Sequence, residues 1–375
     1  MIFVSRSLFH YFFFALLFLL LCGCGATKKT HNLPRFKEVS FKNLEGWDHD
    51  KHLRAAHAFL KSCSVISKKK PGAPISNLTR LGGSAKEWQK VCKIAKSSHL
   101  NSDSAAKKFF ERNFSVYKIS DTHGNETGKM TGYYEITLNG SRTPSSKYKY
   151  PIYKSPPNLS KLKGKRNFCH KSINKGVLEN KKLEIVWVDS AARRFFLHIQ
   201  GSGIVKINKD HFVRLSYDDH NGFPRRSIAS IFNQYCITKV YSPIQMMKWL
   251  DDHPALAKKM MEENQSYVFF RENHSNGVLG GQQSHLTPER SLAIDHRIYP
   301  YGALFWIETT VPKVAHRNQK SHYNRLFVAQ DTGGAIRGPI RGDLFFGHGT
   351  HAEILANGMN SLGKLYILVP KNVKM

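Results

Sequence analysis

Acidic side chains are scarce in this chain. Its 375 residues include 27 Asp and Glu against 57 Lys and Arg, a formal net charge of +30. Such a surplus concentrates acidic polymers around a protein, and nucleic acid, anionic lipid and carboxylate-bearing cell-wall polymers all fit it. The alternative is a solvated basic surface with no specific partner. A disordered chain is excluded, because 41% of the residues are apolar and 12% are aromatic.

Long apolar runs are also missing. The run from Tyr11 to Cys22 is shorter than the about 20 residues of a membrane-spanning helix, and with Arg6 before it the segment 1–23 is typical of a signal peptide. The run ends in Leu21-Cys22-Gly23-Cys24, which resembles a bacterial lipobox and predicts lipid on Cys24. Gly25 in place of Asp favours the outer membrane, with the protein facing the periplasm. Plain cleavage and an uncleaved anchor are the alternatives.

Cysteine pairs with zinc-site spacing are absent, and we expect no cofactor. Four cysteines follow Cys24. We predict a disulfide between Cys63 and Cys92, because each ends a helical pattern and the periplasm is oxidising; two buried thiols are the alternative. Cys169 and Cys236 give no signal. Export also argues against nucleic acid as a partner.

The order of the elements predicts a mainly β protein with added helices. Residues 24–45 are polar and basic and are typical of a tether. A helical pattern covers about 48–114, with Ser102 as a cap, and a second covers about 243–263. Strand patterns occupy most of the remainder, at 129–140, 182–190, 193–207, 211–217, 266–272, 303–310, 325–331 and 364–370.

The segment 328–349 carries the clearest chemical signal. Asp331 ends an apolar run, and Asp343 opens an aromatic one after a glycine-bearing turn. Aromatic neighbours reduce solvation, which raises a carboxyl pKa and keeps a general acid protonated. A turn-forming role for each Asp is the alternative. His348, His351 and Glu353 do not have the spacing of a helical zinc motif, so we predict no metal there.

The same segment resembles the 3D domain of the membrane-bound lytic murein transglycosylase A family. This domain is named for its three aspartates. The third is Asp295, in the block 286–295. Further blocks at 132–135, 195–203 and 264–272, and Gly46-Trp47 near the N-terminus, follow in the family's order. The resemblance covers about 46–370. Ile136 and Glu289 depart from the family pattern without removing any of the three aspartates.

The resemblance implies a two-domain fold. A double-psi β-barrel-like domain is expected from 46–135 and 263–375, with the 3D domain at about 285–370. A smaller β-barrel is expected as an insert at 136–262, with a long groove between the two domains.

The resemblance also implies an activity on peptidoglycan glycan strands. Asp343 is expected to act as acid and then base in cutting the β-1,4 bond between N-acetylmuramic acid and N-acetylglucosamine without water, leaving 1,6-anhydromuramic ends during cell-wall turnover. Asp331 is expected to support it and Asp295 to be structural. Alternatives are a catalytically silent peptidoglycan-binding lipoprotein and a hydrolase with a second carboxylate.

Five residues are candidates for contacting the glycan, because sugar rings pack on aromatic rings and need amide and hydroxyl partners: Tyr133, Tyr134, Gln200, Ser202 and Gly203. Core packing is the alternative for the two tyrosines. Glu272 is expected to be structural. The other predicted partner is the membrane, through the N-terminal lipid, and the sequence does not identify protein partners.

Overall fold

The computed structural model describes residues 33–76, 81–237, 242–275, 277–315 and 319–373. The chain divides into two units, Met1–Leu33 and Pro34–Met375, and the fold below is that of the second unit. The predicted signal peptide 1–23 and the predicted lipid site Cys24 lie outside the described residues. Within the described part, no helix has the length and apolar character needed to cross a membrane.

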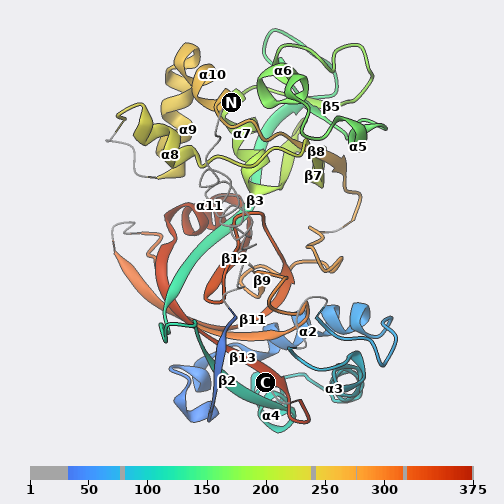
Figure 1. Cartoon of the computed structure of the whole chain (residues 1–375), viewed down its shortest axis with the longest axis vertical. Coiled ribbons are helices and arrows are strands. Elements are labelled where there is room, and N and C mark those ends of the chain that lie inside the picture. Colours follow the sequence, from blue (N-terminus) through green and yellow to red (C-terminus); the bar gives the residue numbers. More distant parts are fainter. Residues whose placement is uncertain (1–32, 77–80, 238–241, 276, 316–318, 374–375) are drawn as a thin grey trace, which may run out of the picture. The chain divides into compact units, whose positions relative to one another are not determined.

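The second unit is rich in strands, with helices placed around them (Figure 1). The strands are β1 Arg35–Val39, β2 Phe114–Ser120, β3 Gly128–Ser141, β4 Tyr150–Tyr153, β5 Glu184–Val188, β6 Ser202–Lys206, β7 Phe212–His220, β8 Val268–Glu272, β9 Ser291–Ala293, β10 Leu304–Pro312, β11 Lys320–Asp331, β12 Arg341–His348 and β13 Asn360–Pro370. The α-helices are α2 His52–Ile66, α3 Ala85–Ser97, α4 Asp103–Asn113, α5 Leu159–Leu162, α6 His170–Asn174, α7 Ala191–Gln200, α8 Ile228–Gln234, α9 Pro243–Asp252, α10 Pro254–Glu262 and α11 Gly349–Gly358. Short 3-10 helices are η1 Phe41–Asn43, η2 Trp47–His49 and η3 Arg166–Phe168. The predicted mainly β fold with helical additions is confirmed.

Six strands close into a ring. Their order is β13-β10-β11-β9-β12-β3, and β3 also pairs with β13, which joins the two ends. Strand β10, the second half of β11 from Leu326, and the second half of β13 from Leu365 are mostly apolar and buried, as expected for strands packed on both faces. This ring is the counterpart of the predicted barrel-like domain.

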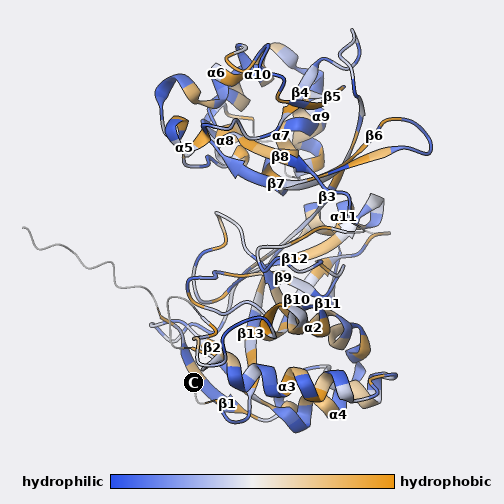
Figure 2. Cartoon of the chain, turned by 90° about the vertical axis from the view of Figure 1, so that its right-hand side faces the viewer, coloured by the Kyte–Doolittle hydropathy of each residue, from blue (hydrophilic) through white to orange (hydrophobic). Residues whose placement is uncertain are grey.

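Strand β3 continues from the ring into the inserted part of the chain. Glu135 is the last β3 residue paired with β12, opposite His348, and Ile136 is the first paired with β6, opposite Gly203. Beyond this point the order of strands is β4-β5-β3-β6-β7-β8, with no hydrogen-bonded pair that joins β8 to β4 among the described strands. In Figure 2 apolar residues run along β6 and the neighbouring part of β3. The predicted domain boundaries and the groove remain predictions.

Three helices cover one side of the ring strands. Helix α2 contacts α3, α4 and β11, and its buried Ala55, Phe59 and Ile66 face the core. Ser102 caps α4 as predicted, accepting a hydrogen bond from the Ala105 backbone N–H at 3.2 Å. The structure joins Cys63 of α2 to Cys92 of α3 in a disulfide.

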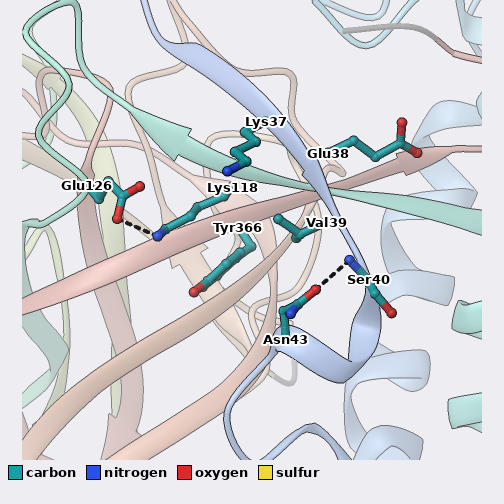
Figure 3. Close-up of a pocket in the computed structure, with 8 residues that line it drawn as sticks. All are labelled: Lys37, Glu38, Val39, Ser40, Asn43, Lys118, Glu126 and Tyr366. Carbon is teal, nitrogen blue, oxygen red and sulfur yellow. Dashed lines mark hydrogen bonds and ion pairs between the residues drawn. The ribbon is translucent and has the colours of Figure 1, made fainter.

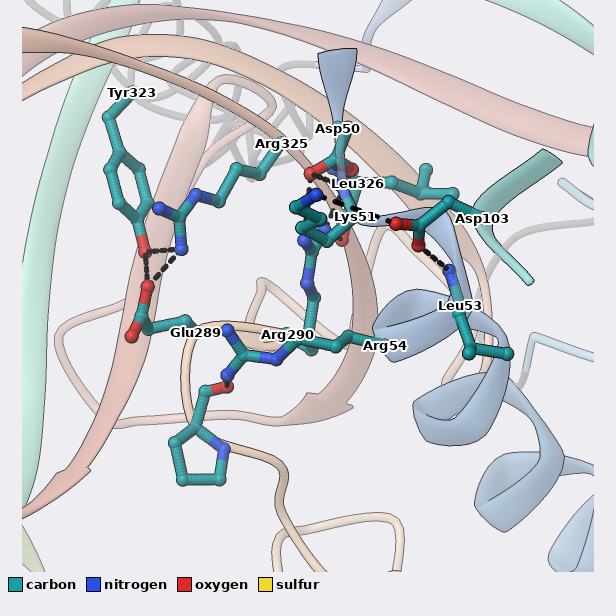
Figure 4. Close-up of polar contacts among 11 residues, drawn as sticks. Asp50, Lys51, Leu53, Arg54, Asp103, Glu289, Arg290, Tyr323, Arg325 and Leu326 are labelled. Atoms are coloured by element: carbon teal, nitrogen blue, oxygen red, sulfur yellow. Dashed lines mark hydrogen bonds and ion pairs between the residues drawn. The ribbon is translucent and has the colours of Figure 1, made fainter. Parts of the chain in front are cut away.

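A buried ion pair connects the segment before α2 to the ring (Figure 4). The two terminal guanidinium nitrogens of Arg290, Nη1 and Nη2, each donate to the Asp50 carboxylate at 2.7 Å, and the Leu326 backbone N–H donates to the same group at 3.0 Å. Because both side chains are nearly inaccessible, loss of either partner leaves an uncompensated buried charge, which typically costs about 3–5 kcal/mol. The N-terminal helices and the ring are therefore held as one unit.

Two secondary-structure predictions were wrong. The predicted strand 193–207 is instead helix α7, followed by β6. Ser190 caps the helix, Ala192, Phe195 and Phe196 repeat at helical spacing, and Gly201 ends it with a φ of +79°. The segment 35–39, predicted as part of the tether, is strand β1, which pairs antiparallel with β2.

Candidate active site

The two predicted aspartates lie in one row across neighbouring strands. Asp331 of β11 and Asp343 of β12 are both paired in register with Ala293 of β9, and Asp343 is paired with Thr131 of β3. Side chains of residues paired across a sheet point to the same face. The fold therefore brings Asp331, Asp343 and Thr131 to one face of the ring.

Asp343 combines partial exposure with a poorly solvated carboxyl group. Thr131 Oγ1 donates a hydrogen bond to its Oδ1 at 2.5 Å. Burial raises the pKa of Asp343, while the positive charge of Arg341, the Thr131 hydrogen bond and the charge of Arg225 act in the opposite direction without cancelling it. A carboxylic acid with a raised pKa can hold a proton near neutrality and donate it, which is the requirement for a general acid.

The carboxyl group of Asp331 accepts hydrogen bonds from the protein. The Gly281 and Thr332 backbone N–H groups donate to Oδ1 at 2.9 and 2.8 Å, and the Tyr133 hydroxyl donates to Oδ2 at 2.7 Å. Burial raises the pKa of Asp331, these three hydrogen bonds lower it, and the charge of Asp343 raises it further. The contacts fit a residue that fixes the loop 279–282 and Tyr133 beside Asp343.

Asp295, the third predicted aspartate, is held in an ion pair with Arg297. It is 1% exposed, and Arg297 donates to both of its oxygens at 2.8 and 2.7 Å. The backbone N–H groups of Arg297 and Gly338 also donate to it, at 3.2 and 3.0 Å. Although burial alone raises it, the pKa of Asp295 is lowered by these donors, which favours the ionised form, and the Gly338 contact connects Asp295 to the turn before β12.

The five predicted glycan-contacting residues separate into two groups. Tyr133 points to the Asp331 side, and its ring lies 5.2 Å from that of Phe345. Tyr134 points to the other face of β3, where its hydroxyl donates to Glu353 at 3.0 Å. Gln200 accepts a hydrogen bond from the Tyr134 backbone N–H at 3.1 Å, so it ties α7 to β3.

The remaining two candidates are buried in the sheet of the insert. Ser202 is 4% exposed. A Cβ atom on Gly203 would lie 2.8 Å from the Ile136 carbonyl oxygen, so glycine is needed there for close strand packing. This burial argues against direct contact of either residue with a substrate. Glu272 pairs with Arg142 through both oxygens, as expected of a structural residue.

The sequence analysis did not identify four residues of the site. Thr131 and Arg341 contact or act on Asp343, and Arg225 acts on it from the insert. Glu135, 3.1 Å from Arg214 Nε, lies on the same side of β3 as Thr131 and Tyr133, and burial raises its pKa to about 7 despite Arg214. The alternation of side chains along β3 could have placed Thr131 and Glu135 on the same face as Tyr133. Arg225 and Arg341 are brought to the site by contacts between distant segments, which the sequence pattern does not reveal.

The segment that follows β12 and carries His351 is helical. His351 and Glu353 belong to α11, and Glu353 bonds to Tyr134. Within the described ranges no group of three His, Cys, Asp or Glu side chains has the geometry to hold a metal ion.

Two cavities lie away from the aspartates. One, of about 560 Å³, is lined by Lys37, Lys118, Glu126 and Tyr366, among others (Figure 3). The second, of about 520 Å³, lies in the insert beside Arg194 and the start of α7. Neither includes Asp331 or Asp343.

Two family models match successive segments of the chain. Residues 129–271 match the model of the MltA specific insert domain, and residues 290–369 match that of the 3D domain. The membrane-bound lytic murein transglycosylase A of Escherichia coli K12 is 28% identical over 253 residues, covering 66% of this chain and 67% of that protein.

Solved structures match over most of the chain. A membrane-bound lytic murein transglycosylase from Agrobacterium tumefaciens is 30% identical, with a TM-score of 0.77 over 90% of this chain and 98% of that one. MltA from Neisseria gonorrhoeae is 25% identical, with a TM-score of 0.75 over 91% and 94%.

Proposed function

Because the chain belongs to the membrane-bound lytic murein transglycosylase A family, we propose that it is a lyase that cuts the β-1,4 bond between N-acetylmuramic acid and N-acetylglucosamine in peptidoglycan. Its products carry 1,6-anhydromuramic ends, and its role is in cell-wall turnover. The observation that carries this proposal is the raised pKa of the partly exposed Asp343, which is paired between Ala293 of β9 and Thr131 of β3.

The first step is proton donation. Protonated Asp343 gives its proton to the glycosidic oxygen as the bond from that oxygen to C1 of the muramic residue breaks and positive charge develops on the sugar ring. Thr131 keeps the carboxyl group oriented through its hydrogen bond to Oδ1. The leaving N-acetylglucosamine departs with the proton.

The second step uses the same group as a base. The Asp343 carboxylate takes the proton of the C6 hydroxyl of the muramic residue, whose oxygen bonds to C1 of the same ring. The proton is back on Asp343 at the end of the cycle. Because the nucleophile belongs to the substrate itself, proximity replaces the second carboxylate that ordinary glycosidases need.

A murein hydrolase is the second candidate function, favoured by one observation. Asp331 lies on the same face as Asp343, two strands away, so their Cα atoms are about 10 Å apart at the usual strand spacing. A second carboxylate there is available in principle to activate water. The three protein donors on Asp331 argue instead for a supporting role.

Product analysis separates these functions. Purified murein sacculi are digested in water enriched in ¹⁸O, and the products are examined by mass spectrometry. The proposal predicts anhydro ends without the heavy isotope. Reducing ends that carry ¹⁸O indicate hydrolysis, and no release of fragments indicates a silent binding protein.

We also propose that the protein is anchored in the outer membrane by lipid on Cys24 and faces the periplasm. The support is the short apolar run that ends in Leu21-Cys22-Gly23-Cys24. Cys24→Ser is expected to release the protein from membranes or to block its processing, whereas Cys22→Ser is the matched control and is expected to leave both unchanged. Cleaved Cys24→Ser protein in the outer-membrane fraction contradicts the proposal.

A further inference from the structure

Arg225 is a fixed, exposed cation at the C-terminal end of helix α7. It lies between β7 and α8, and its Nη2 donates to the carbonyl oxygens of His198 and Ile199 at 2.6 and 3.1 Å. These carbonyls belong to the last turn of α7, where the helix dipole favours a positive charge. The guanidinium is therefore held in one orientation, and it uses only one of its nitrogens for this purpose.

The charges of Asp343 and Tyr217 act on Arg225, and the charge of Arg225 acts in turn on the buried His198. The neighbouring Arg226 differs, because it is paired with Glu263 at 2.6 Å and also bonds to Gln234. Arg341, the other cation that acts on Asp343, is occupied by Thr131 and by backbone carbonyls. Arg214, also in the insert, is paired with Glu135 at 3.1 Å, so Arg225 is the insert cation that acts on Asp343.

An exposed aromatic ring accompanies this cation. Tyr217 is 43% exposed on β7, and a Cβ atom placed on Gly201 would lie 4.0 Å from Tyr217 Cβ. Gly201 directly follows α7, whose last-turn carbonyls hold Arg225, so the ring and the guanidinium flank the same turn. In Figure 1, α7 and β7 lie in the inserted part of the chain, next to the end of β3 that continues into it.

We propose that Arg225 and Tyr217 form a subsite that selects the anionic muramic residue, with Arg225 binding its carboxylate and Tyr217 packing against its sugar ring. This inference rests on the proposed function and names the substrate feature that it recognises. A guanidinium binds a carboxylate with two parallel hydrogen bonds. The carboxylate can be that of the lactyl group on a peptide-free strand or one from an attached stem peptide.

Substrate binding at this subsite is also expected to change the pKa of Asp343. The positive charge of Arg225 lowers the pKa of Asp343, and a bound carboxylate offsets that charge. The anionic substrate therefore favours the protonated form of Asp343 that the first step requires, whereas an uncharged glycan does not.

Binding measurements test the subsite without turnover. Asp343→Asn protein is titrated with three glycans: peptide-bearing strands, peptide-free strands with lactyl carboxylates, and peptide-free strands whose carboxylates are converted to methylamides. With Arg225 present, anionic strands are expected to bind about 10–100-fold more tightly than the amidated ones, the usual worth of a charged, paired hydrogen bond. Arg225→Met is expected to remove this preference and to leave binding of amidated strands unchanged.

The controls separate a specific contact from loss of fold or of general charge. Arg226→Met removes the neighbouring charge and is expected to keep the preference. Arg225→Lys keeps the positive charge but loses the two parallel N–H donors of the guanidinium, and it is expected to retain part of the preference for anionic strands. Loss confined to peptide-bearing strands assigns the contact to the stem peptide, and loss on both anionic strands assigns it to the lactyl group.

Three results overturn the proposal: equal weakening on amidated strands, no weakening on either anionic strand, or the same effect from Arg226→Met. None of them depends on whether the enzyme forms anhydro ends or hydrolyses the bond. Failure of the subsite is therefore distinguishable from failure of the proposed function.

Discussion

Asp331 and Asp343 approach the same residue, Ala293, from opposite sides of strand β9. Their carboxyl groups share one face of the ring but differ in their surroundings. Asp331 accepts three hydrogen bonds from the protein, whereas Asp343 accepts one, from Thr131. This difference supports the proposal that Asp343 is the acid and base and that Asp331 has a supporting role.

Asp331→Asn tests this division. The asparagine oxygen can still accept from Gly281 and Thr332, and its amide can donate to a reoriented Tyr133 hydroxyl, so the loss in kcat/KM is expected to be about 10-fold or less, the worth of one ordinary hydrogen bond. Asp331→Leu leaves these donors unpaired and is expected to lower both activity and unfolding temperature. A loss from Asp331→Asn as large as that from Asp343→Asn contradicts the supporting role.

The pH dependence of kcat/KM follows from the acid step. Asp343 must be protonated in the free enzyme, so the rate falls as pH rises through its pKa, which burial has raised. Arg341 lowers that pKa, so its removal raises the pKa, and the alkaline limb is expected to move to higher pH in Arg341→Met.

The control for this shift is Arg337→Met. Arg337 bonds to the Gly333 and Ile336 carbonyls and lies 3.8 Å from Asp295, so the limb is expected to stay in place. An unmoved limb in Arg341→Met, or a shift to lower pH, contradicts the assignment of this limb to Asp343.

The disulfide between Cys63 and Cys92 gives a prediction on stability. It closes a loop with a sequence separation of 29, and a crosslink of this kind typically stabilises by about 2–4 kcal/mol. The double Cys63→Ser, Cys92→Ser variant is expected to unfold at lower denaturant concentration by that margin, and non-reducing peptide mapping should find the pair joined. Cys169→Ser, which removes a free thiol, is the control; two alkylated thiols in native protein contradict the pairing.

Local sequence pattern was sufficient for most of the ring. The apolar runs of β10, β11 and β13 have no competing helical period, and their strands were predicted near their observed positions. Residues 193–200 were predicted wrongly because adjacent aromatic residues favour strands, although Ala192, Phe195 and Phe196 repeat at helical spacing.

The site was only partly accessible from sequence. Asp331 and Asp343 stand out because glycine and aromatic residues surround them. Their common pairing with Ala293 depends on strand order, which a pattern along the chain does not contain. Arg225 and Arg341 are two among many basic residues, and only contacts between distant segments distinguish them from a solvated surface.

The most direct test of the account is turnover of murein sacculi by Asp343→Asn, with products identified by mass spectrometry. The variant keeps the shape of the side chain but cannot cycle a proton, and general acid–base assistance is typically worth about 10²–10⁴-fold in rate. Since both steps use the same group, we predict a loss at the upper end of this range, with an unchanged unfolding temperature and no anhydro ends above background. Anhydro ends released by Asp343→Asn at a rate within about 10-fold of the unmodified enzyme, well short of the loss expected for an acid–base group, would contradict the account and assign the acid to another residue.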